Sequence, residues 1–300
     1  MPSAREMRLR IRSVKNIGQV TRALQAVSAS KVRRAMQANS STRPYSEKAW
    51  KVLLHLARQP GHSSLHPLLS EREHVDKVLV LMITSDRGLA GASNVNVLRH
   101  TLEHFRSFEQ PIAYVPVGRK GRDLLWRRRR DILAEFSNLP SPPSFLDVSA
   151  IGRLLIDEYL SGRIDRVYLA YNEFGNMIRQ DPVVRKLLPL EVEFVNDEQS
   201  NEKSYNVTHA QKSVFIYEPD QSELLDQIVP RFTRIQVFQA ILSAQASEHA
   251  ARMVSMRNAT ENAAELAEAL QLEYNKARQQ TITNDLLDIA GGAEALMQQG

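Results

Sequence analysis

The sequence contains no cysteine, which excludes disulfides, thiolate metal sites, cysteine nucleophiles and thiol switches. No apolar run approaches about 18 residues, so no segment is predicted to cross a membrane as a helix. Aromatic residues make up only 6% of the chain. These absences are typical of a chain that uses much of its length for extended helix and less of it for a large core.

Helix breakers are missing from the C-terminal part of the chain. Pro230 is the last proline, and no glycine occurs from there until Gly291. A continuous helix between residues 231 and 290 would be about 90 Å long at about 1.5 Å per residue. Such a helix must project beyond any core that a 300-residue chain makes alone. Its length favours a mechanical or assembly role over catalysis.

The C-terminal segment, residues 220–300, carries an apolar seam with a period of 3.5 residues, which indicates a left-handed coiled coil. Many seam positions are alanine, so a partner helix can approach closely, and Pro230 should kink the helix near its start. The seam consists of Leu242, Ala246, His249, Met253, Met256, Thr260, Ala263, Ala267, Leu270, Tyr274, Ala277 and Thr281, and then shifts by one position to Ile282, Leu286, Ile289, Ala293 and Leu296.

The N-terminal segment, residues 1–60, is the predicted partner helix and should fold back antiparallel. It is shorter, so the end of the C-terminal helix should extend beyond it, and Pro44 should bend or interrupt it. Residues 1–51 hold twelve Lys and Arg against two acids. This basic helix suits either a phosphate backbone or an acidic protein surface. One face of the helix carries Ile17, Val20, Leu24 and Val27.

The composition of residues 1–43 also permits another interpretation. These residues are rich in arginine and serine and poor in acids, as organellar transit peptides are. However, the helical periodicity begins almost at the first residue, so we expect no cleaved leader.

The middle segment, residues 75–219, alternates between strand and helix patterns, which predicts βαβ units and a mainly parallel sheet. A helix is predicted over 151–160, a loop over 140–143 and a polar stretch over 196–211. The expected strands cover residues 78–83, 112–117, 167–171, 190–195 and 213–217.

Three motifs have both a functional and a structural interpretation. The turn from Thr84 to Gly91 follows a predicted strand, where nucleotide enzymes hold phosphate, but it matches no phosphate-binding motif and suits a tight turn better. The arginines at 127–130, beside Trp126, could bind nucleic acid, although a solvated helix face is the simpler interpretation. His249 is expected to pack in the seam with one hydrogen bond. We find no nucleophile–base pair, paired carboxylates or metal cluster, so no catalytic residue, cofactor or metal is predicted.

Three blocks of sequence resemble a known family. They are residues 11–34, with Thr-Arg-Ala-Leu-Gln-Ala-Val-Ser-Ala-Ser-Lys at 21–31; Thr-Ser-Asp-Arg-Gly-Leu at 84–89 with Asn-Val-Asn at 94–96; and residues 246–293, with Ala-Ser-Glu-His-Ala-Ala-Arg-Met at 246–253 and Tyr-Asn-Lys-Ala-Arg-Gln at 274–279. In order and spacing they resemble the γ subunit of the F-type ATP synthase over essentially the whole chain.

The resemblance implies a fold of mixed α/β class: a long antiparallel coiled coil of the terminal helices, plus a central Rossmann-like α/β domain with a mainly parallel sheet. It implies a non-catalytic rotor within a ring of three α and three β subunits. The expected partners are these subunits, the ε subunit and the c-ring, with no nucleic acid, and with the membrane reached only through the c-ring. A bacterial enzyme is expected, on the cytoplasmic face of the membrane.

The resemblance also implies roles for matched residues. Arg278, Gln279 and Thr283 are expected to meet loops of β, and Arg252 to join that polar network. Leu24, near an acidic segment of β, replaces the family's usual methionine. The basic residues Lys31, Arg33 and Arg34 are expected at the same α/β ring. Tyr217 and Glu218 are expected at the foot that meets the c-ring and ε.

Some positions depart from the family pattern. Gly18 lies inside the first helix, where it costs about 1 kcal/mol relative to alanine. Ala26 replaces a methionine, and Ala90, Ala92 and Ser93 replace the common Cys, Gly and Phe. These departures affect single contacts and leave the family assignment unchanged.

Overall fold

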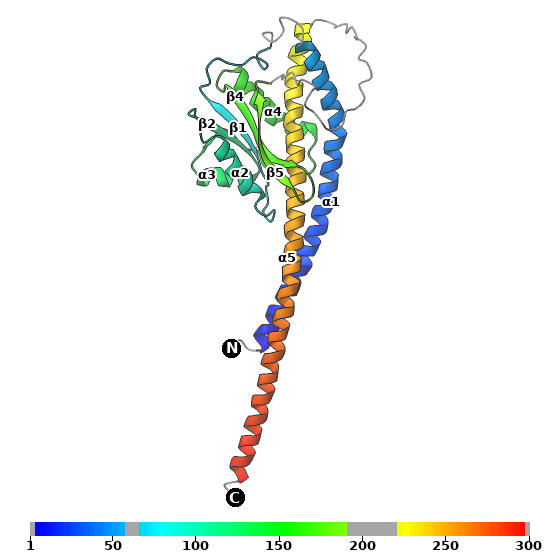
Figure 1. Ribbon diagram of the computed structural model, residues 1–300, viewed down its shortest axis with the longest axis vertical. Coiled ribbons are helices and arrows are strands. Elements are labelled where there is room, and N and C mark those ends of the chain that lie inside the picture. The colour runs from blue at the N-terminus through cyan, green and yellow to red at the C-terminus, as the bar shows by residue number, and fades with distance from the viewer. Residues whose placement is uncertain (1–3, 58–65, 191–220, 298–300) are drawn as a thin grey trace, which may run out of the picture. The chain divides into compact units, whose positions relative to one another are not determined.

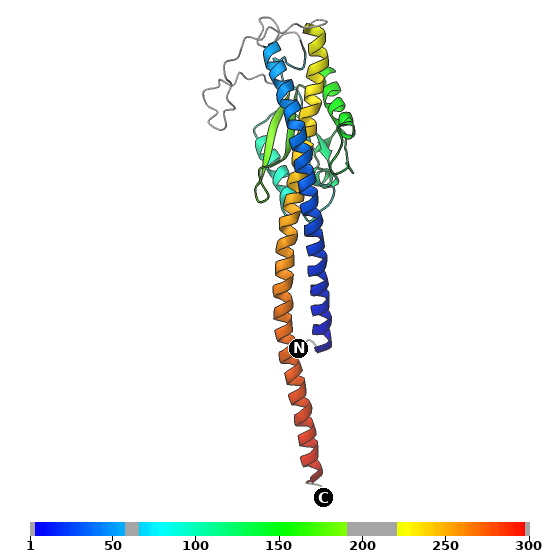
Figure 2. The ribbon, with the colours of Figure 1, turned by 90° about the vertical axis from the view of Figure 1, so that its right-hand side faces the viewer.

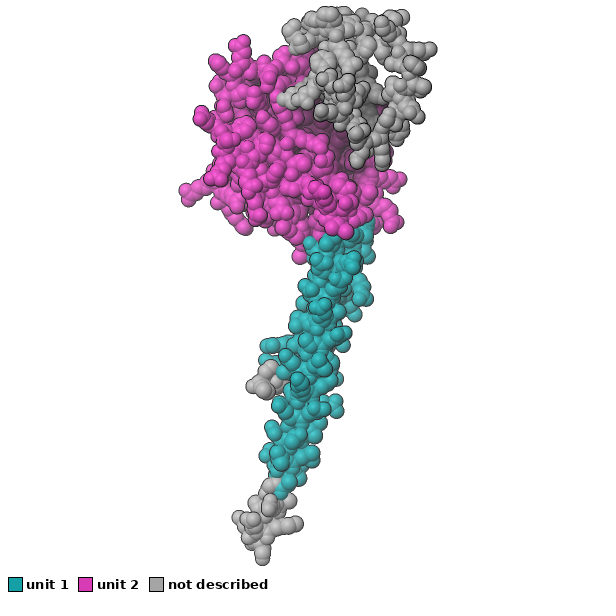
Figure 3. Space-filling view, in the orientation of Figure 1, with its two compact units in different colours: residues 1–29, 252–300 teal, residues 30–251 magenta. Residues whose placement is uncertain are grey.

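The computed structural model describes residues 4–57, 66–190 and 221–297. The chain forms two compact units: residues 1–29 with 252–300, and residues 30–251 (Figure 3). Two long helices, α1 (Ala4–Ala57) and α5 (Gln221–Met297), contribute to both units. The division therefore cuts both helices, whereas the predicted boundaries at 60 and at 219 and 220 lie near their ends and the boundary at 75 lies just before β1. The predicted α/β class with long terminal helices is confirmed.

The second unit contains a five-stranded sheet in the order β3–β2–β1–β4–β5. The strands β1 (Val78–Ile83), β2 (Ile112–Val117), β3 (Asp131–Ile132) and β4 (Arg166–Phe174) are parallel. The edge strand β5 (Gln180–Leu188) runs antiparallel to β4. The mainly parallel sheet is thus confirmed, with a strand order typical of Rossmann-like folds.

The strand predictions had mixed success. β1 and β2 have the predicted bounds, and β4 contains the predicted strand 167–171. The sequence pattern did not predict β3 or β5. Of the strand expected over 190–195, only Leu190 is described, and it belongs to no strand. The strand expected over 213–217 and the polar stretch 196–211 lie outside the described residues.

Helices cover both faces of the sheet (Figure 1). β1 is buried at every position, and its alternate residues enter two cores. Leu79, Leu81 and Ile83 pack with α4 (Phe145–Leu160) and α5. Val78, Val80 and Met82 pack with α2 (Ser93–His104) and α3 (Arg119–Arg127). The unit is therefore a three-layer sandwich, and the helix predicted over 151–160 is the C-terminal part of α4.

The first part of α5 forms much of the second unit's core. Leu225, Val229, Phe232 and Ile241 are at most 2% exposed. α5 continues through Pro230, and α1 continues through Pro44. Of the two effects predicted for Pro44, a bend or an interruption, the interruption is wrong, because a proline removes one N–H donor and leaves most other hydrogen bonds of a long helix in place. Among the described helices, none is both long enough and apolar enough to cross a membrane.

The first unit is a pair of antiparallel helices, and α1 and α5 lie side by side in both views (Figures 1 and 2). The Thr21 and Thr260 hydroxyls are hydrogen-bonded at 2.7 Å. A Cβ placed on Gly18 would lie 3.5 Å from Cβ of Ala263. Moving back along α1 thus corresponds to moving forward along α5, which confirms the antiparallel pairing.

The seam of this coiled coil is made largely of small side chains. Met256, Ala263 and Ala267 are buried on α5, as the seam predicted. On the part of α1 that belongs to this unit, the buried residues among those described are Met7, Ile11, Thr21 and Ser28. Ile17, Val20 and Val27 are more than half exposed, so the apolar face singled out on α1 is not the face that packs on α5. The small side chains of Thr21, Ala263 and Ala267 let the two backbones approach closely.

Candidate functional site

The end of α5 presents apolar side chains to solvent. Every residue from 278 to 290 is exposed. Ile282, Leu286 and Ile289, which the shifted seam singled out, are 47%, 61% and 69% exposed. The predicted extension of α5 beyond its partner helix is confirmed (Figure 2). Exposed apolar surface of this extent marks an interaction site, since a free helix would place polar residues there.

A similar stripe lies on α1. Leu9, Ile17, Val20 and Val27 are between 54% and 61% exposed. They recur on one side of the helix beside the buried seam, and arginines such as Arg12 and Arg22 are exposed among them. The outer surface of α1 therefore combines apolar contact area with positive charge, a combination suited to an acidic, partly apolar partner.

The predicted contact residues of α5 fall into two places. Arg278, Gln279 and Thr283 are exposed on neighbouring turns, with Gln279 and Thr283 on one face because they are four residues apart. Arg252 is half-buried and lies 26 residues before Arg278, about 39 Å along the helix. A single side-chain network cannot join them within this chain, so the network predicted for Arg252 would have to run through another protein.

The predicted contact residues of α1 also differ in their surroundings. Leu24 in the first unit is half-buried, and its carbonyl accepts a hydrogen bond from Ser28 at 2.8 Å. Lys31 is half-buried, whereas Arg33 and Arg34 are exposed, and all three fall in the second unit. The foot residues Tyr217 and Glu218 lie outside the described residues.

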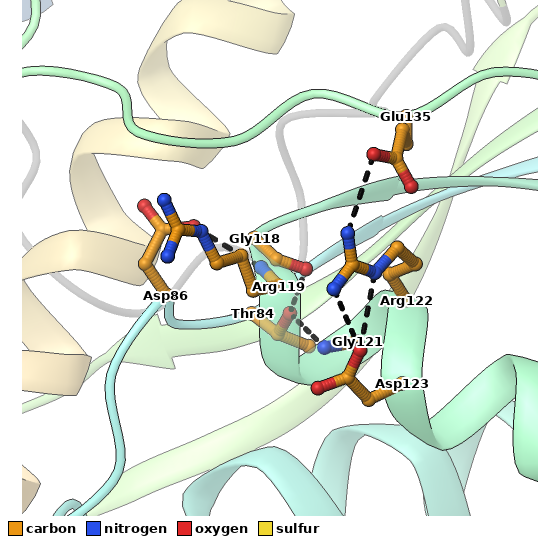
Figure 4. A network of polar contacts seen from close by, with 8 residues as sticks. All are labelled: Thr84, Asp86, Gly118, Arg119, Gly121, Arg122, Asp123 and Glu135. Atoms are coloured by element: carbon orange, nitrogen blue, oxygen red, sulfur yellow. Dashed lines mark hydrogen bonds and ion pairs between the residues drawn. The ribbon is translucent and has the colours of Figure 1, made fainter.

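The turn that begins at Thr84 binds its own chain (Figure 4). The carboxylate of Asp86 accepts hydrogen bonds from the backbone N–H groups of Arg119 at 3.1 Å and Asn138 at 2.9 Å. The hydroxyl of Thr84 accepts from the N–H of Gly121 at 2.9 Å and donates to the carbonyl of Val117 at 3.1 Å. The N-terminus of α3 is therefore already occupied by an anion of the protein.

The crevice at the carboxyl ends of β1 and β4 is almost filled. In doubly wound folds, nucleotides bind at this point, where the strand order reverses. Here the free space is about 20 Å³, lined by residues of the turn, of α2 and β4, and by Ala244, Gln245 and Glu248 of α5. That volume suits one water molecule and excludes a nucleotide. The interpretation of the Thr84 turn as a structural turn is confirmed.

Three hydrogen bonds attach α5 to the loop at 140–143 and to the end of β4. The ring of His249, which is 5% exposed, lies 2.8 Å from the Ser141 hydroxyl. The Gln245 amide donates to the carbonyl of Pro140 at 2.9 Å, and the Ser243 hydroxyl accepts from the N–H of Phe174 at 3.0 Å. The packing role predicted for His249 is confirmed. The predicted loop 140–143 supplies Ser141 as the partner of His249 and Pro140 as the partner of Gln245.

A partly buried ion pair, which the sequence analysis missed, lies at the opposite end of the sheet, where β4 begins. Arg72 donates to the carboxylate of Asp165 at 2.7 Å and to the carbonyl of Tyr159 at 2.6 Å. Burial alone would raise the pKa of Asp165, but Arg72 and the N–H groups of Lys77 and Asp76 hold this pKa below its ordinary value. Spacing gave no signal for this pair, because its members are 93 residues apart.

The arginines at 127–130 are all exposed at the end of α3, beside Trp126, which is 72% exposed. In the part of the chain that the structure describes, no three His, Asp or Glu side chains gather as a metal site. What remains as the candidate functional surface is the coiled coil and the projecting end of α5.

Comparison with known proteins identifies the family. Residues 3–296 match the family model described as ATP synthase. The chain is 43% identical over 297 residues to the ATP synthase gamma chain of Dehalococcoides mccartyi strain CBDB1, covering 99% of this chain and 100% of the relative. The chain belongs to the ATP synthase gamma chain family. A gamma chain from Roseiflexus castenholzii is 42% identical over 299 residues and one from Legionella pneumophila is 37% identical over 299, each covering 99% of this chain and, respectively, 99% and 100% of the relative.

Solved structures of ATP synthase chains share the fold of this gamma chain. A rotor chain of the Euglena gracilis mitochondrial ATP synthase superposes with a TM-score of 0.63 at 19% identity, covering 93% of this chain and 98% of that one. A chain from the central stalk and c-ring of the Tetrahymena thermophila enzyme gives 0.59 at 21% identity, covering 80% of this chain and 99% of that one. At these identities the likeness establishes the fold alone.

Proposed function

We propose that this chain is the central stalk, or rotor, of the F1 sector of a proton-translocating ATP synthase. It couples rotation of a membrane ring to ATP synthesis or hydrolysis on the β subunits. The observation that carries the proposal is the match to gamma chains over 99% of this chain and the full length of the relatives. The chain itself is a non-catalytic subunit, and ATP chemistry belongs to its partners.

The geometry of the coiled coil supports this role. The end of α5 exposes apolar side chains along residues 278–290, which require an enclosing partner. Within the first unit, the seam of Gly18, Thr21, Ala263 and Ala267 brings the helices close together. A thin shaft with an exposed apolar tip fits inside a ring of subunits.

The charge on α1 supports the same role. Arg5, Arg8, Arg10 and Arg12 are exposed and make no ion pair with a described residue. Long cationic side chains attract an acidic ring without one fixed partner each. A rotor that passes three equivalent positions needs such interchangeable contacts, because deep complementary contacts would hold it at one position.

The partners follow from the proposed role. The three segments 1–60, 75–219 and 220–300 serve as the N-terminal helix, the domain near the membrane ring and the main shaft. Three α and three β subunits surround the coiled coil, where Leu24, Lys31, Arg33, Arg34, Arg252, Arg278, Gln279 and Thr283 make contacts. Tyr217 and Glu218 belong to the foot that meets ε and the c-ring. The complex lies on the cytoplasmic face of the bacterial membrane and holds this chain peripherally.

Reconstitution tests the proposal. The chain is expressed with its cognate α and β subunits, purified through a tag on β, and assayed for hydrolysis of MgATP. We expect about one copy for three β subunits and activity well above that of α and β alone. Failure to co-purify, together with salt-sensitive binding of the chain to DNA or RNA, would refute the rotor role.

A matched pair of variants sharpens this experiment. Arg278→Ala with Gln279→Ala removes the predicted contacts from the exposed end of α5 and should lower turnover without loss of the subunit from the complex. Arg153→Ala removes an exposed arginine from α4, far along the chain from the coiled coil, and should leave turnover unchanged. Equal effects of both changes would contradict the contact assignment.

A further inference from the structure

The end of α3 adopts a conformation that its sequence does not favour. The N–H of Arg129 bonds to the carbonyl of Trp126 at 2.8 Å, and the N–H of Arg130 bonds to that of Leu125 at 3.1 Å. These two bonds form a Schellman motif, whose left-handed position usually holds glycine. Here that position is Arg129, with φ of 52°. A side chain in this region is strained, and such strain is concentrated at functional sites.

The Schellman turn places a cationic hollow beside an exposed aromatic ring. Trp126 is 72% exposed, although indole is among the side chains that gain most from burial. A hollow of about 410 Å³ is lined by Asp123, Trp126, Arg127 and Arg129. The only acid in its lining is already neutralised, because Arg122 donates to Asp123 at 2.9 Å (Figure 4). The free charge of the hollow is therefore positive.

Positive charge in the α/β domain is concentrated at this helix. Residues 119–130 contain seven Lys and Arg and one acid, whereas the rest of residues 66–190 contains eleven Lys and Arg and fourteen acids. No carboxylate among the described residues forms an ion pair with any of the arginines at 127–130. Cations at a helix C-terminus are favourable in themselves, which accounts for Arg127 and Arg128. That effect explains neither the exposed Trp126 nor an arginine in a glycine position.

We propose that the hollow formed by Trp126, Arg127 and Arg129 docks an acidic segment of a protein partner. Trp and Arg are the residues that most often dominate the energy of protein interfaces. Arginine pairs with carboxylates in a forked geometry, while the indole covers an apolar side chain between them. A nucleic acid would need a longer basic track along its phosphates, and the surrounding domain carries more acids than bases. The inference goes beyond the shaft role and does not depend on it.

Fluorescence of the full chain tests the proposal. The chain has two tryptophans, so Trp50→Phe leaves Trp126 as the only emitter. The probe is a peptide of about twelve residues in which Glu and Asp alternate with Leu and Phe. The same peptide with Gln and Asn in place of the acids is one control, and oligo-dT of similar length is the other. We expect saturable binding of the acidic peptide with a change in Trp126 emission, and calorimetry on the unmodified chain should give the same affinity.

Variants separate docking from structure. Arg127→Gln with Arg129→Gln should weaken binding at least about tenfold, whereas Arg153→Gln, a single exposed arginine on α4, should not change it. Arg129→Gly is the sharpest change, because it removes a cation and relieves the backbone. It should weaken binding about fivefold while the midpoint of urea unfolding stays the same or rises.

Three results would overturn the proposal. One is no binding of the acidic peptide at millimolar concentration. Another is an equal loss of binding with Arg153→Gln, which would mean that net charge alone matters. The third is tighter, steeply salt-dependent binding of oligo-dT, which would make the hollow part of a nucleic-acid surface.

Discussion

The two compact units differ in the size of the side chains that they bury. In the second unit, Tyr114, Tyr159 and Phe232 are at most 2% exposed within the α/β sandwich. In the first unit, the helices meet largely through small side chains such as Thr21 and Ala263, and many large apolar side chains face outwards. Burial of large side chains supplies most of the stability of a domain. The second unit therefore holds its structure through a large apolar core, whereas the first leaves much of its large apolar surface exposed.

Removing the same side chain from each unit should give the largest contrast. Leu81→Ala empties a fully buried position in the middle of β1 and should lower the free energy of unfolding by about 2–5 kcal/mol. Leu286→Ala changes a side chain that is 61% exposed and should change it by less than about 0.5 kcal/mol. Urea unfolding followed by circular dichroism measures both.

The effect of Leu286→Ala on binding has to be measured in the assembled complex. Leu286→Ala should weaken retention of the chain with α and β, because its side chain belongs to the exposed tip of α5. If Leu286→Ala destabilised the isolated chain as much as Leu81→Ala, the contrast between the two units would be wrong.

Two glycines should respond to alanine with opposite signs. Gly118 has a φ of 101°, and a Cβ there would clash with the carbonyl of Thr84, so Gly118→Ala should cost about 1–3 kcal/mol for the backbone alone. Gly18 is helical, and its Cβ would make an ordinary contact with Ala263. Gly18→Ala should therefore stabilise the chain by about 1 kcal/mol. Thermal unfolding compares them, and a loss of stability with Gly18→Ala would mean that the seam tolerates no closer packing.

Charge should matter more inside the second unit than on its surface. Asp165→Asn keeps the shape of the side chain but removes the charge paired with Arg72, and should cost about 1–3 kcal/mol at pH 7. The folded pKa of Asp165 lies below the ordinary value of 3.8, so its contribution exists above that value and is lost as the pH falls through the folded pKa. Unfolding curves of the variant should lack that acid-dependent loss.

A surface pair provides the control for this variant. Arg179 and Asp181 are joined at 2.8 Å on the exposed end of the β4–β5 hairpin. Asp181→Asn should change stability by less than about 1 kcal/mol, because solvent screens exposed pairs. An equal loss in the free energy of unfolding with Asp165→Asn and Asp181→Asn would show that burial of an ion pair does not affect its contribution to stability.

The smallest expected effect concerns His66, which is 5% exposed. Its Nδ1 atom accepts a hydrogen bond from the backbone N–H of Leu68 at 3.1 Å. Burial lowers the pKa of His66 below 6.5, although Asp226 opposes the shift. The unfolded chain therefore binds the proton first, and stability should fall as the pH drops from about 6.5 towards the folded pKa, by at most about 1.4 kcal/mol per pH unit. His66→Asn should show a smaller slope in urea unfolding between pH 7.5 and 5, and an unchanged slope would contradict this assignment.

The sequence predicted correctly those elements whose side chains are compatible with a single kind of secondary structure. β1 and β2 are continuous apolar runs, which suit only strands buried on both faces, and their bounds were correct. β5 was missed because Pro182, Arg185 and Lys186 interrupt its apolar pattern, as an edge strand allows. The two residues of β3 are too few to give a periodic signal.

The packing face of α1 was missed for a different reason. Sequence patterns give weight to large apolar residues, so Ile17 and Val20 stood out while Thr21 and Ser28 did not. In this coiled coil, small residues such as Thr21 make up much of the packing face together with Met7 and Ile11, whereas Ile17 and Val20 stay exposed. The contact residues of α5 could be matched through the family resemblance alone, because exposed polar side chains such as Gln279 leave no mark in hydrophobic periodicity.

The 77-residue helix α5 belongs to a stable core at one end, and its residues 278–290 near the other end are all exposed. Backbone amides near Phe232 can exchange their hydrogen only when the α/β sandwich opens, whereas those near Leu286 are held by helical hydrogen bonds alone. One unbroken element therefore spans a gradient of exchange rates in the isolated chain. An enclosing partner would slow exchange at the tip of α5 first, which makes this end a built-in reporter of assembly.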